Sequence, residues 1–494
     1  MSAMDIPARK VLVVAQRPSD FSEMRRAIDA LHRLGWRVGL IYFCPAPPSP
    51  EEARLFEELE GRKRNGTLED YQLVGGGSSG SSGTRLAKPV RRARNRLPEW
   101  ARRVFLTVYR LIMGFISNMR SAVRVIRLYF HNQRAIGSVI DRFRPDAILL
   151  PEDIVGPVLP LVIKAGHDRN LPSVILPYTI ANQQEAFRSL SSNPVYQFAF
   201  LPNRLIGLVF PRWVMRQDGR ALVRLPAPYI VGQVLTRTSP PDPWMMNSGF
   251  ANAVAVENQA MLDYYRDAGL PLSKLKVVGA VYDDELAHHR ANRTALLASL
   301  HAELGLVGDK PLLLVGGCPD QTKSSPPGFE FADMEEFCRR LAQTLRPLQQ
   351  SYHIVVRPHP NYTEMGRIMA EEGVPCTLFD TAGLVAASDI YLAFGSATIR
   401  WAIACGIPAI NYDVFHYDYS DYRGVDGVVH LNRLSHLTAI LPTLAPGRPE
   451  LADLQSRIAG SAPRWGMLDG RSTLRIAELI NGFCSLPVVT RTAK

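Results

Sequence analysis

The chain has 494 residues, 46% hydrophobic and 21% charged, which indicates a globular protein too long for a single core. Its six cysteines include no Cys-x-x-Cys pair, and no signal peptide or long uncharged apolar run is apparent, so we expect a cytoplasmic protein without a disulfide framework or a zinc site. The net charge of +11 comes almost entirely from residues 85–134, which contain 13 Lys and Arg residues and one acid.

Strand and helix patterns alternate from the start of the chain. Lys10–Val14 predicts a strand, Phe21–Leu34 a helix and Trp36–Phe43 a second strand. This alternation is typical of a doubly wound α/β domain. Because no Gly-x-Gly-x-x-Gly sequence follows the first strand, a dinucleotide cofactor is disfavoured.

A Gly- and Ser-rich run then interrupts the alternation. Glu51–Val74 has a charged, helical pattern, and Gly75–Gly83 follows with the composition of a flexible linker. The regularity of this run resembles an artificial linker. We leave it out of the fold assignment, and whether it is native stays open.

The basic segment 85–134 has a helical pattern. Its apolar residues recur at three- and four-residue steps: Val104, Val108, Leu111, Phe115, Met119, Ala122, Ile126 and Phe130. The pattern predicts one amphipathic helix, or two in succession, with arginines on the polar face. Such a helix suits an anionic membrane surface. A helix packed on the domain with solvated arginines is the alternative, and nucleic acid is disfavoured because the aromatic residues lie on the apolar face.

Two adjacent carboxylates, Glu152 and Asp153, follow the predicted strand Asp146–Leu150. The carboxyl end of a parallel strand is where ligands bind in open α/β sheets. A neighbouring carboxylate and partial burial raise the pKa of a carboxyl group toward the range of a general base. We therefore predict that Glu152 or Asp153 is the catalytic base, with capping of the next helix as the alternative role of Asp153. The polar stretch Pro177–Arg188, which includes Glu185, is a candidate acceptor site.

The alternation of strands and helices predicts two Rossmann-like domains. We assign residues 1–285 to an N-terminal acceptor domain, which includes a loop-and-helix excursion at 190–250. Residues 286–470 form the C-terminal donor domain, and 471–494 form a C-terminal helix and tail that returns to the first domain.

The second domain begins with a strand that ends in two glycines. Pro311–Val315 is the strand, and Gly316 and Gly317 follow it. Glycines at this place allow the backbone to approach a phosphate or a base closely. We include both, with Gln321 and Lys323 of the same loop, in a candidate donor site.

The stretch Tyr352–Asp413 contains the strongest motifs of the chain. A strand at 353–356 leads into Arg357-Pro-His359-Pro, and a strand at 388–394 leads into Ser396-Ala-Thr398 at the start of a helix. Hydroxyls and main-chain N–H groups at a helix start suit an anion. The aromatic and acidic loop that follows this stretch is a candidate sugar site: His416, Tyr417 and Asp418.

Strand–Arg-Pro-His-Pro, then strand–Ser-x-Thr–helix–Gly-Ile-Pro, resembles the C-terminal half of bacterial surface-polysaccharide transferases of the GT-B type. The likeness is to capsule-polysaccharide Kdo transferases and CDP-glycerol glycerophosphotransferases, and more distantly to non-hydrolysing UDP-GlcNAc 2-epimerases. It extends over about Ala147–Asp413. The resemblance implies that Arg357, His359, Ser396 and Thr398 hold the donor's phosphates. Those families usually have a ribose-binding Glu where this chain has Trp401.

The resemblance implies a glycosyltransferase with two Rossmann-like domains facing a cleft. We expect it to invert the anomeric centre, because the base would lie on the domain opposite the donor, and to be peripheral on the inner face of a bacterial membrane, because of the basic segment 85–134. The donor would be CMP-Kdo or a related CMP-sugar, and the acceptor a growing surface polysaccharide or glycolipid. No Asp-x-Asp sequence is present, so we expect no metal or other cofactor. The alternatives are a CDP-glycerol-type phosphotransferase, a UDP-sugar 2-epimerase and a non-catalytic, membrane-associated assembly factor.

Overall fold

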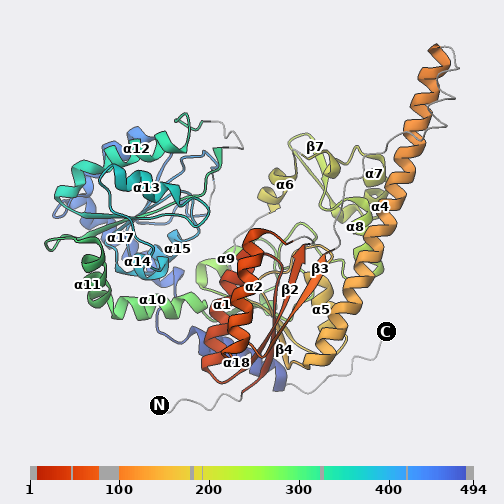
Figure 1. Ribbon diagram of the computed structural model, residues 1–494, viewed down its shortest axis with the longest axis horizontal. Helices are drawn as coiled ribbons and strands as arrows, with labels where there is room; N and C mark the ends of the chain where they lie inside the picture. Colours follow the sequence, from red (N-terminus) through yellow and green to blue (C-terminus); the bar gives the residue numbers. More distant parts are fainter. Residues whose placement is uncertain are drawn as a thin grey trace. The chain divides into compact units, whose positions relative to one another are not determined.

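A computed structural model describes residues 8–45, 48–76, 99–177, 183–191, 193–322, 328–418 and 421–485, with the side chains of the long helix described from Arg120 onward. The contacts within the chain divide it into two compact units (Figure 1). Unit 1 comprises residues 1–254 and 479–494, and unit 2 comprises residues 255–478.

A seven-stranded sheet with the order β3-β2-β1-β4-β5-β8-β9 forms the centre of unit 1 and continues past its boundary, which falls within β8. The strands are β1 (Lys10–Ala15), β2 (Arg37–Pro45), β3 (Asp70–Gly76), β4 (Ala147–Leu150), β5 (Ser173–Ile175), β8 (Ala253–Val256) and β9 (Leu275–Val277). The central strand β1 pairs in parallel with both β2 and β4. Its apolar residues are buried on both faces, as a parallel sheet covered by helices requires.

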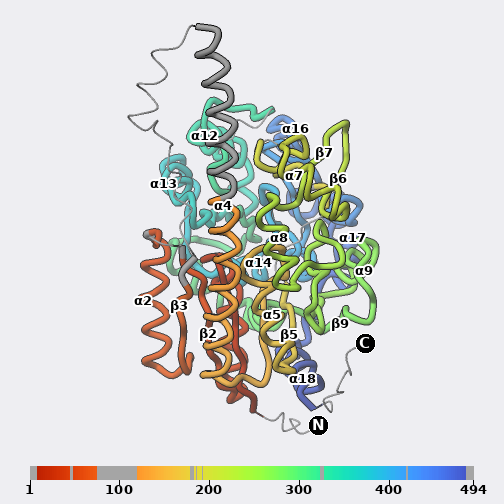
Figure 2. The backbone as a smooth tube through the Cα atoms, turned by 90° about the vertical axis from the view of Figure 1, so that its right-hand side faces the viewer, coloured from red at the N-terminus to blue at the C-terminus, as the bar shows by residue number. Residues whose placement is uncertain are grey.

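Helices and one hairpin complete unit 1 (Figures 1 and 2). The helices are α1 (Pro18–Arg33), α2 (Pro50–Arg64), α4 (Glu99–Phe143), α5 (Leu159–His167), α6 (Gln183–Ser191), α7 (Leu201–Val209) and α8 (Ala227–Leu235). The hairpin joins β6 (Val214–Gln217) to β7 (Arg220–Val223) in antiparallel pairing. The predicted excursion at 190–250 therefore consists of α7, this hairpin and α8.

Residues 99–134 of the basic segment lie in one continuous helix, α4, which contacts β3, α5 and α8 (Figure 2). Residues 85–98 lie outside the described residues. Its buried face includes Val125, Tyr129 and Ile136, whereas Phe130 of the predicted apolar face is exposed. The prediction was wrong about the face because Tyr129 packs against Gly232 of α8, where a Cβ would overlap the tyrosine ring. Glycine at 232 thus selects which side of α4 is buried.

Unit 2 contains a five-stranded sheet with the order β11-β10-β12-β13-β14, in which all neighbours are parallel. The strands are β10 (Leu312–Gly316), β11 (His353–Arg357), β12 (Ile390–Ala393), β13 (Ala409–Tyr412) and β14 (Val428–Leu431). The helices of unit 2 are α9 (Gln259–Asp267), α10 (Val281–Ala291), α11 (Arg293–Leu304), α12 (Met334–Leu345), α13 (Glu364–Glu371), α14 (Thr381–Ala387), α15 (Ile399–Ala404), α16 (Leu434–Ile440), α17 (Pro449–Trp465) and the first part of α18 (Ser472–Ser485).

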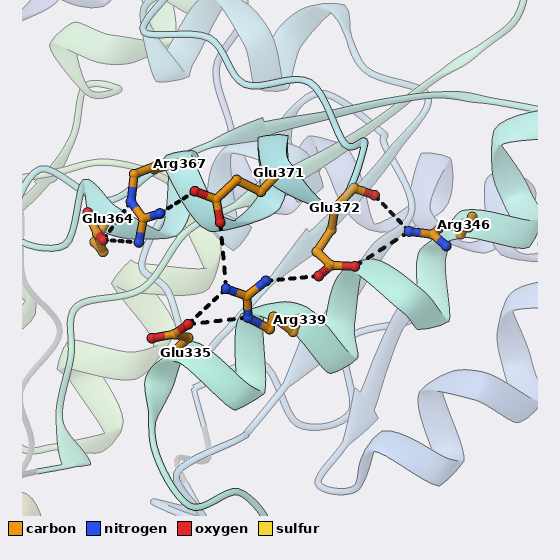
Figure 3. A network of polar contacts seen from close by, with 7 residues as sticks. All are labelled: Glu335, Arg339, Arg346, Glu364, Arg367, Glu371 and Glu372. Carbon is orange, nitrogen blue, oxygen red and sulfur yellow. Dashed lines mark hydrogen bonds and ion pairs between the residues drawn. The ribbon is translucent and has the colours of Figure 1, made fainter.

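An ion-pair network joins α12 to the end of α13 on the surface of unit 2 (Figure 3). Arg339 of α12 lies 2.8 Å from Glu335 on its own helix and 3.0 Å from Glu372, and it also approaches Glu371. Exposed pairs of this kind contribute little each, because water and salt screen them. The apolar cluster beneath, which includes Phe337 and Leu341, is the larger stabilising contribution.

The division between the units differs from the one that the sequence suggested. Helices α9 and α10 fall in unit 2 because they contact α17 and α14. Helix α18 spans the division, and its last residues join unit 1, where Asn481 accepts a hydrogen bond of 2.6 Å from Arg9. In the part of the chain that the structure describes, no helix has both the length and the apolar character needed to cross a membrane.

Candidate functional site

The carboxyl edge of the five-stranded sheet brings the motifs of unit 2 together. Its register pairs Gly316 with Arg357, while β12, which leads to Ser396 and Thr398, lies on the other side of β10. The three predicted donor loops therefore follow three neighbouring strands, β11, β10 and β12. This is the edge at which parallel α/β sheets bind ligands.

The buried Tyr391 of β12 connects these loops, and the sequence analysis did not identify it. Its hydroxyl lies 2.5 Å from Oγ1 of Thr398, which in turn lies 2.8 Å from Oγ of Ser396. Burial raises the pKa of Tyr391 to about 12, although the bonds to both hydroxyls and the charge of Arg357 act in the opposite direction. Any Cβ at Gly316 would overlap the Tyr391 hydroxyl, so this glycine is required by close packing.

Gly317 supports the Arg-Pro-His-Pro loop directly. Its N–H donates to the carbonyl of Arg357 at 2.8 Å. A Cβ at this position would lie 2.6 Å from the main-chain nitrogen of His359 and 3.0 Å from Cα of Pro358. Gly316 and Gly317 thus allow close packing against Tyr391 and against the Arg-Pro-His-Pro loop. Their contact with a phosphate remains a prediction.

His359 is held in one tautomer by its own loop. The main-chain N–H of Asn361 donates to Nδ1 of His359 at 3.1 Å, so the neutral ring carries its proton on Nε2. Burial lowers the pKa of His359 below its ordinary value of 6.5, and the positive charge of Arg357 lowers it further. The side chain is therefore a neutral N–H donor at pH 7 rather than a cation. The guanidinium of Arg357 donates to the carbonyls of Pro358 and Phe379.

A polar pocket of about 460 Å³ lies at the other part of the same edge, at the ends of β12, β13 and β14. Its lining includes Gly395, Asn411, Asp413, His416, Asp418 and His430. The amide oxygen of Asn411 accepts from the N–H of Gly395 at 2.9 Å, and its nitrogen donates to Nδ1 of His430 at 3.4 Å. Nε2 of His430 donates to the carbonyl of Tyr422 at 2.9 Å. Asn411 and His430 were not predicted: His430 lies on β14, which was not recognised as a strand, and nothing distinguished Asn411 within the predicted strand β13.

The aromatic loop beside this pocket is organised by Asp413. The carboxylate of Asp413 accepts from the main-chain N–H groups of Tyr417 at 3.0 Å and Asp418 at 2.7 Å. His416 and Asp418 have left-handed φ angles of 55° and 58°, which the tight loop imposes. The hydroxyl of Tyr417 donates to Gln321, so the structure joins a predicted sugar residue to a predicted donor residue.

Trp401 is a packing residue. Its side chain is buried and lies against Tyr282, with ring centroids 5.5 Å apart. The preceding residue, Arg400, forms a buried ion pair with Glu257 at 2.9 Å, and the two side chains are 5% and 3% exposed. Its guanidinium also lies over the ring of Tyr282, 5.1 Å from the centroid. The guanidinium of Arg400, in the first turn of α15, is thus directed at Glu257 within unit 2.

Unit 1 has a separate polar cluster around Glu152, at the carboxyl end of β4. Glu152 is 2% exposed, and its Oε1 lies 2.6 Å from the guanidinium of Arg17, which also pairs with the buried Asp20 at 2.9 Å. Burial raises the pKa of Glu152 to about 7. The charge of Arg17 opposes the shift, but Arg17 is half-exposed and therefore partly screened by water. A carboxyl group with this pKa can accept or donate a proton near neutral pH.

Asp153 has a structural environment distinct from that of Glu152. Its main-chain N–H donates to the amide oxygen of Asn247 at 2.8 Å, and the main-chain N–H of Asn247 returns a bond of 2.9 Å to its carbonyl. Its carboxylate lies so close to Gly249 that a Cβ there would overlap it. The alternative role as a cap was wrong, because α5 begins after Val158, too far along the chain for Asp153 to cap it.

Two predicted residues cannot be placed. Lys323 lies outside the described residues, and Glu185 lies on α6 with its side chain outside them. Among the residues that the structure describes, no group of three or more His, Cys, Asp and Glu side chains is arranged to hold a metal ion.

No protein-family model matches the chain, and no curated protein matches it. Solved structures do match the chain. The UDP-GlcNAc 2-epimerase of Neisseria meningitidis bound to UDP-GlcNAc aligns with a TM-score of 0.52 at 10% identity, over 96% of this chain and 100% of the other. The calicheamicin glycosyltransferase CalG4 aligns with a TM-score of 0.50 at 13% identity, over 99% and 100%. A putative UDP-N-acetylglucosamine 2-epimerase of Listeria monocytogenes aligns with a TM-score of 0.50 at 11% identity, over 96% of both chains.

The chain has the GT-B fold. Its two parallel sheets and the alignments over nearly the whole length confirm the predicted class of two Rossmann-like α/β domains. Within this GT-B chain, the candidate residues occupy the carboxyl edges of both sheets: the Glu152 cluster in unit 1, and the Tyr391 cluster with the polar pocket in unit 2.

Proposed function

We propose that the protein is an inverting glycosyltransferase that transfers a sugar from a nucleotide-activated donor to a growing bacterial surface polysaccharide or glycolipid. The observation that carries this proposal is the convergence at one sheet edge of Arg357, the His359 loop and the Ser396–Thr398 helix start around Tyr391. Arginine, a neutral imidazole N–H and hydroxyls at a helix start are groups that bind a diphosphate or monophosphate.

In the proposed reaction the sugar–phosphate bond breaks and an acceptor hydroxyl attacks the anomeric carbon from the opposite face. Arg357, Nε2–H of His359 and the hydroxyls of Ser396 and Thr398 stabilise the charge on the departing phosphate. Glu152, in its ionised form, accepts the proton of the acceptor hydroxyl. Its pKa of about 7 supports this role, because the group is then a competent base at neutral pH.

Our proposed donor is CMP-Kdo or a related CMP-sugar. Its support is the resemblance of the Arg-Pro-His-Pro and Ser-x-Thr motifs to capsule Kdo transferases. Because Trp401 packs against Tyr282, we propose that the ribose binds elsewhere, in the pocket lined by Asn411 and His416. We further propose that these protein groups bind the phosphate without a metal ion.

We also propose that the protein works on the inner face of the bacterial membrane, with the basic segment 85–134 against anionic lipid. The exposed arginines on the described part of α4 support this contact: Arg120, Arg124, Arg127 and Arg134. The acceptor in the proposal, a lipid-linked glycan, is found at such a surface.

A calorimetric screen of CMP, CDP, UMP, UDP and GDP tests the donor proposal. We expect tight CMP binding by the wild type, loss of binding in His359→Ala, and unchanged binding in His32→Ala, an exposed histidine of α1. A preference for UDP or UMP would move the protein to another donor class. A folded protein that binds no nucleotide would overturn the proposal in favour of a non-catalytic assembly factor.

A UDP-sugar 2-epimerase is the second candidate, favoured by the alignment with the Neisseria meningitidis epimerase, whose structure contains UDP-GlcNAc. An epimerase needs no acceptor. Incubation of the protein with UDP-GlcNAc alone, followed by analysis of the sugar, would show a 2-epimer if this candidate were right, and unchanged UDP-GlcNAc if the transferase proposal were right.

A further inference from the structure

Helix α7 of unit 1 has an unusual distribution of polarity. Its fully buried residues are Asn203 and Gly207. Ile206 packs against the apolar cluster around Trp213, but the other large apolar residues face solvent, with exposed fractions of 64% for Leu201, 58% for Leu205, 68% for Leu208 and 67% for Val209. A helix on a globular protein ordinarily turns its apolar side inward. Grouped exposed leucines of this kind mark an interaction surface.

The orientation of α7 is fixed by its two buried residues. The amide nitrogen of Asn203 donates to the carbonyl of Val195 at 2.8 Å, and its oxygen accepts from the N–H of Ala227 at 3.0 Å. A Cβ at Gly207 would lie 2.8 Å from the ring of Phe198, so the helix contacts that ring through its backbone. Rolling the helix to bury its leucines would break these bonds and this contact. The exposed leucines are therefore imposed by the local structure.

Positive charge surrounds this apolar surface. Residues 193–241 contain six arginines and one acid, Asp218. Arg204 lies on α7 itself and is exposed, as are Arg212 directly after it and Arg216 and Arg220 on the adjacent hairpin. Helix α7 contacts α8, and α8 contacts the basic helix α4 (Figures 1 and 2). The arginines around α7 and those of α4 are therefore carried by neighbouring helices of unit 1.

We propose that α7 docks unit 1 on an anionic lipid bilayer, with Leu205 and Leu208 entering the boundary between headgroups and acyl chains. The charge pattern identifies this occupant: an apolar helix face bordered by arginines matches an interface that is anionic outside and apolar inside. The inference rests on the membrane contact of the proposed function and assigns it to a surface outside residues 85–134. It is independent of the donor site in unit 2.

Co-sedimentation of the full chain with lipid vesicles tests the docking surface. The vesicles are phosphatidylcholine alone, or phosphatidylcholine with about one third phosphatidylglycerol. We expect the wild type to bind the anionic vesicles, and Leu205→Ser/Leu208→Ser to bind at least roughly tenfold more weakly. The matched control is Val307→Ser/Leu378→Ser, two apolar residues of unit 2 that are 85% and 74% exposed, and it should bind like the wild type.

A charge variant completes the test. Arg204→Gln/Arg212→Gln should weaken binding to anionic vesicles by about fivefold per arginine. The proposal is overturned if folded wild type fails to bind these vesicles, or if only substitutions of the α4 arginines reduce binding. It is also overturned if sedimentation velocity shows a dimer that the leucine substitutions dissociate. CMP titration of the same preparations separates the outcomes, because loss of vesicle binding with intact CMP binding rejects the docking surface alone.

Discussion

The main-chain N–H of Asn361 points at Nδ1 of His359 from 3.1 Å and so determines which nitrogen of that ring carries a proton. A protonated ring could not accept this bond, because both of its nitrogens would be donors. The loop that presents His359 to the sheet edge is therefore coupled to the neutral state of the side chain. Burial and the charge of Arg357, which both lower the pKa, act in the same direction.

This coupling predicts how substitutions of His359 differ. His359→Asn keeps an acceptor near Nδ1 but does not reach the place of Nε2, whereas His359→Gln places an N–H donor near Nε2. We expect His359→Gln to retain part of the CMP affinity and His359→Asn to lose roughly ten- to a hundredfold, as for a hydrogen bond to a charged group. Calorimetry measures the affinities. Equal losses in both variants would contradict the role of Nε2–H.

The same histidine predicts a pH dependence of stability. Its folded pKa lies below the ordinary value of 6.5, so the unfolded chain binds the proton more readily. The stability that the neutral ring contributes is present above pH 6.5 and is lost as the pH falls through the lower folded value. Urea unfolding from pH 7.5 to pH 5 should show a steeper loss for the wild type than for His359→Gln. Parallel curves would contradict the prediction.

The buried carboxyl group of Glu152 predicts a pH dependence of stability with the opposite sign. The folded carboxyl group keeps its proton up to about pH 7, whereas an unfolded glutamate releases it near 4.5, so stability falls as the pH rises between these values. Glu152→Gln does not ionise, and its stability relative to the wild type should increase by about 3 kcal/mol from pH 4.5 to pH 8.

Transfer activity should fall by roughly 10² to 10⁴ in the same variant. Glu51→Gln, on the exposed start of α2, is the control. A stable but fully active Glu152→Gln protein would reject Glu152 as the base.

Gly317 predicts a specific steric effect. In Gly317→Ala the new Cβ would meet the nitrogen of His359 at 2.6 Å, so the Arg-Pro-His-Pro loop must shift. We expect CMP affinity to fall by at least roughly tenfold, because a displaced phosphate contact loses a charge-assisted hydrogen bond. Gly460→Ala on α17, where a Cβ meets open space, should leave affinity unchanged and stabilise the helix slightly. Unchanged binding in Gly317→Ala would show that this loop does not hold the nucleotide.

The ion pair of Arg400 and Glu257 predicts a large stability loss when it is broken. Glu257→Gln would remove the ion-pair partner at 2.9 Å from a cation that is only 5% exposed, at a cost of about 3 to 5 kcal/mol. Arg339→Gln in the exposed network of Figure 3 should cost far less, because water replaces the lost pairs. Chemical denaturation of the two variants measures the contrast. Similar losses would show that the buried pair contributes no more than a surface pair.

The sequence predicted those strands whose residues are apolar on both faces, because central strands of a parallel sheet are buried twice. β1, β4, β10, β12 and β13 belong to this class, and β11, although it lies at the edge of its sheet, is buried as well. The outer strands β3 and β14 were missed. Leu73 of β3 and His430 of β14 are exposed, so an edge strand combines polar and apolar residues in a pattern that resembles a helix or a loop.

The motifs at the sheet edge were predictable because each follows a recognisable strand, but their mutual contacts were not. Nothing in the pattern around Tyr391 distinguishes a hydroxyl that binds Thr398 from an ordinary core tyrosine. The pairing of Arg17 with Glu152 likewise joins residues that are 135 positions apart. Such long-range pairs depend on the order of strands in the sheet, which local periodicity does not contain.

Helix α18 has a consequence for how the protein is made. Unit 2 is formed by the continuous residues 255–478, whereas unit 1 needs the segment after residue 478, where Asn481 binds Arg9 and Cys484 contacts the carbonyl of Asp146. A ribosome therefore releases every residue of unit 2 before the last contacts of unit 1 exist. During synthesis the domain that is begun first is therefore completed last, because Arg9 and Asp146, which directly precede β1 and β4, have no contact with α18 until this helix has left the exit tunnel.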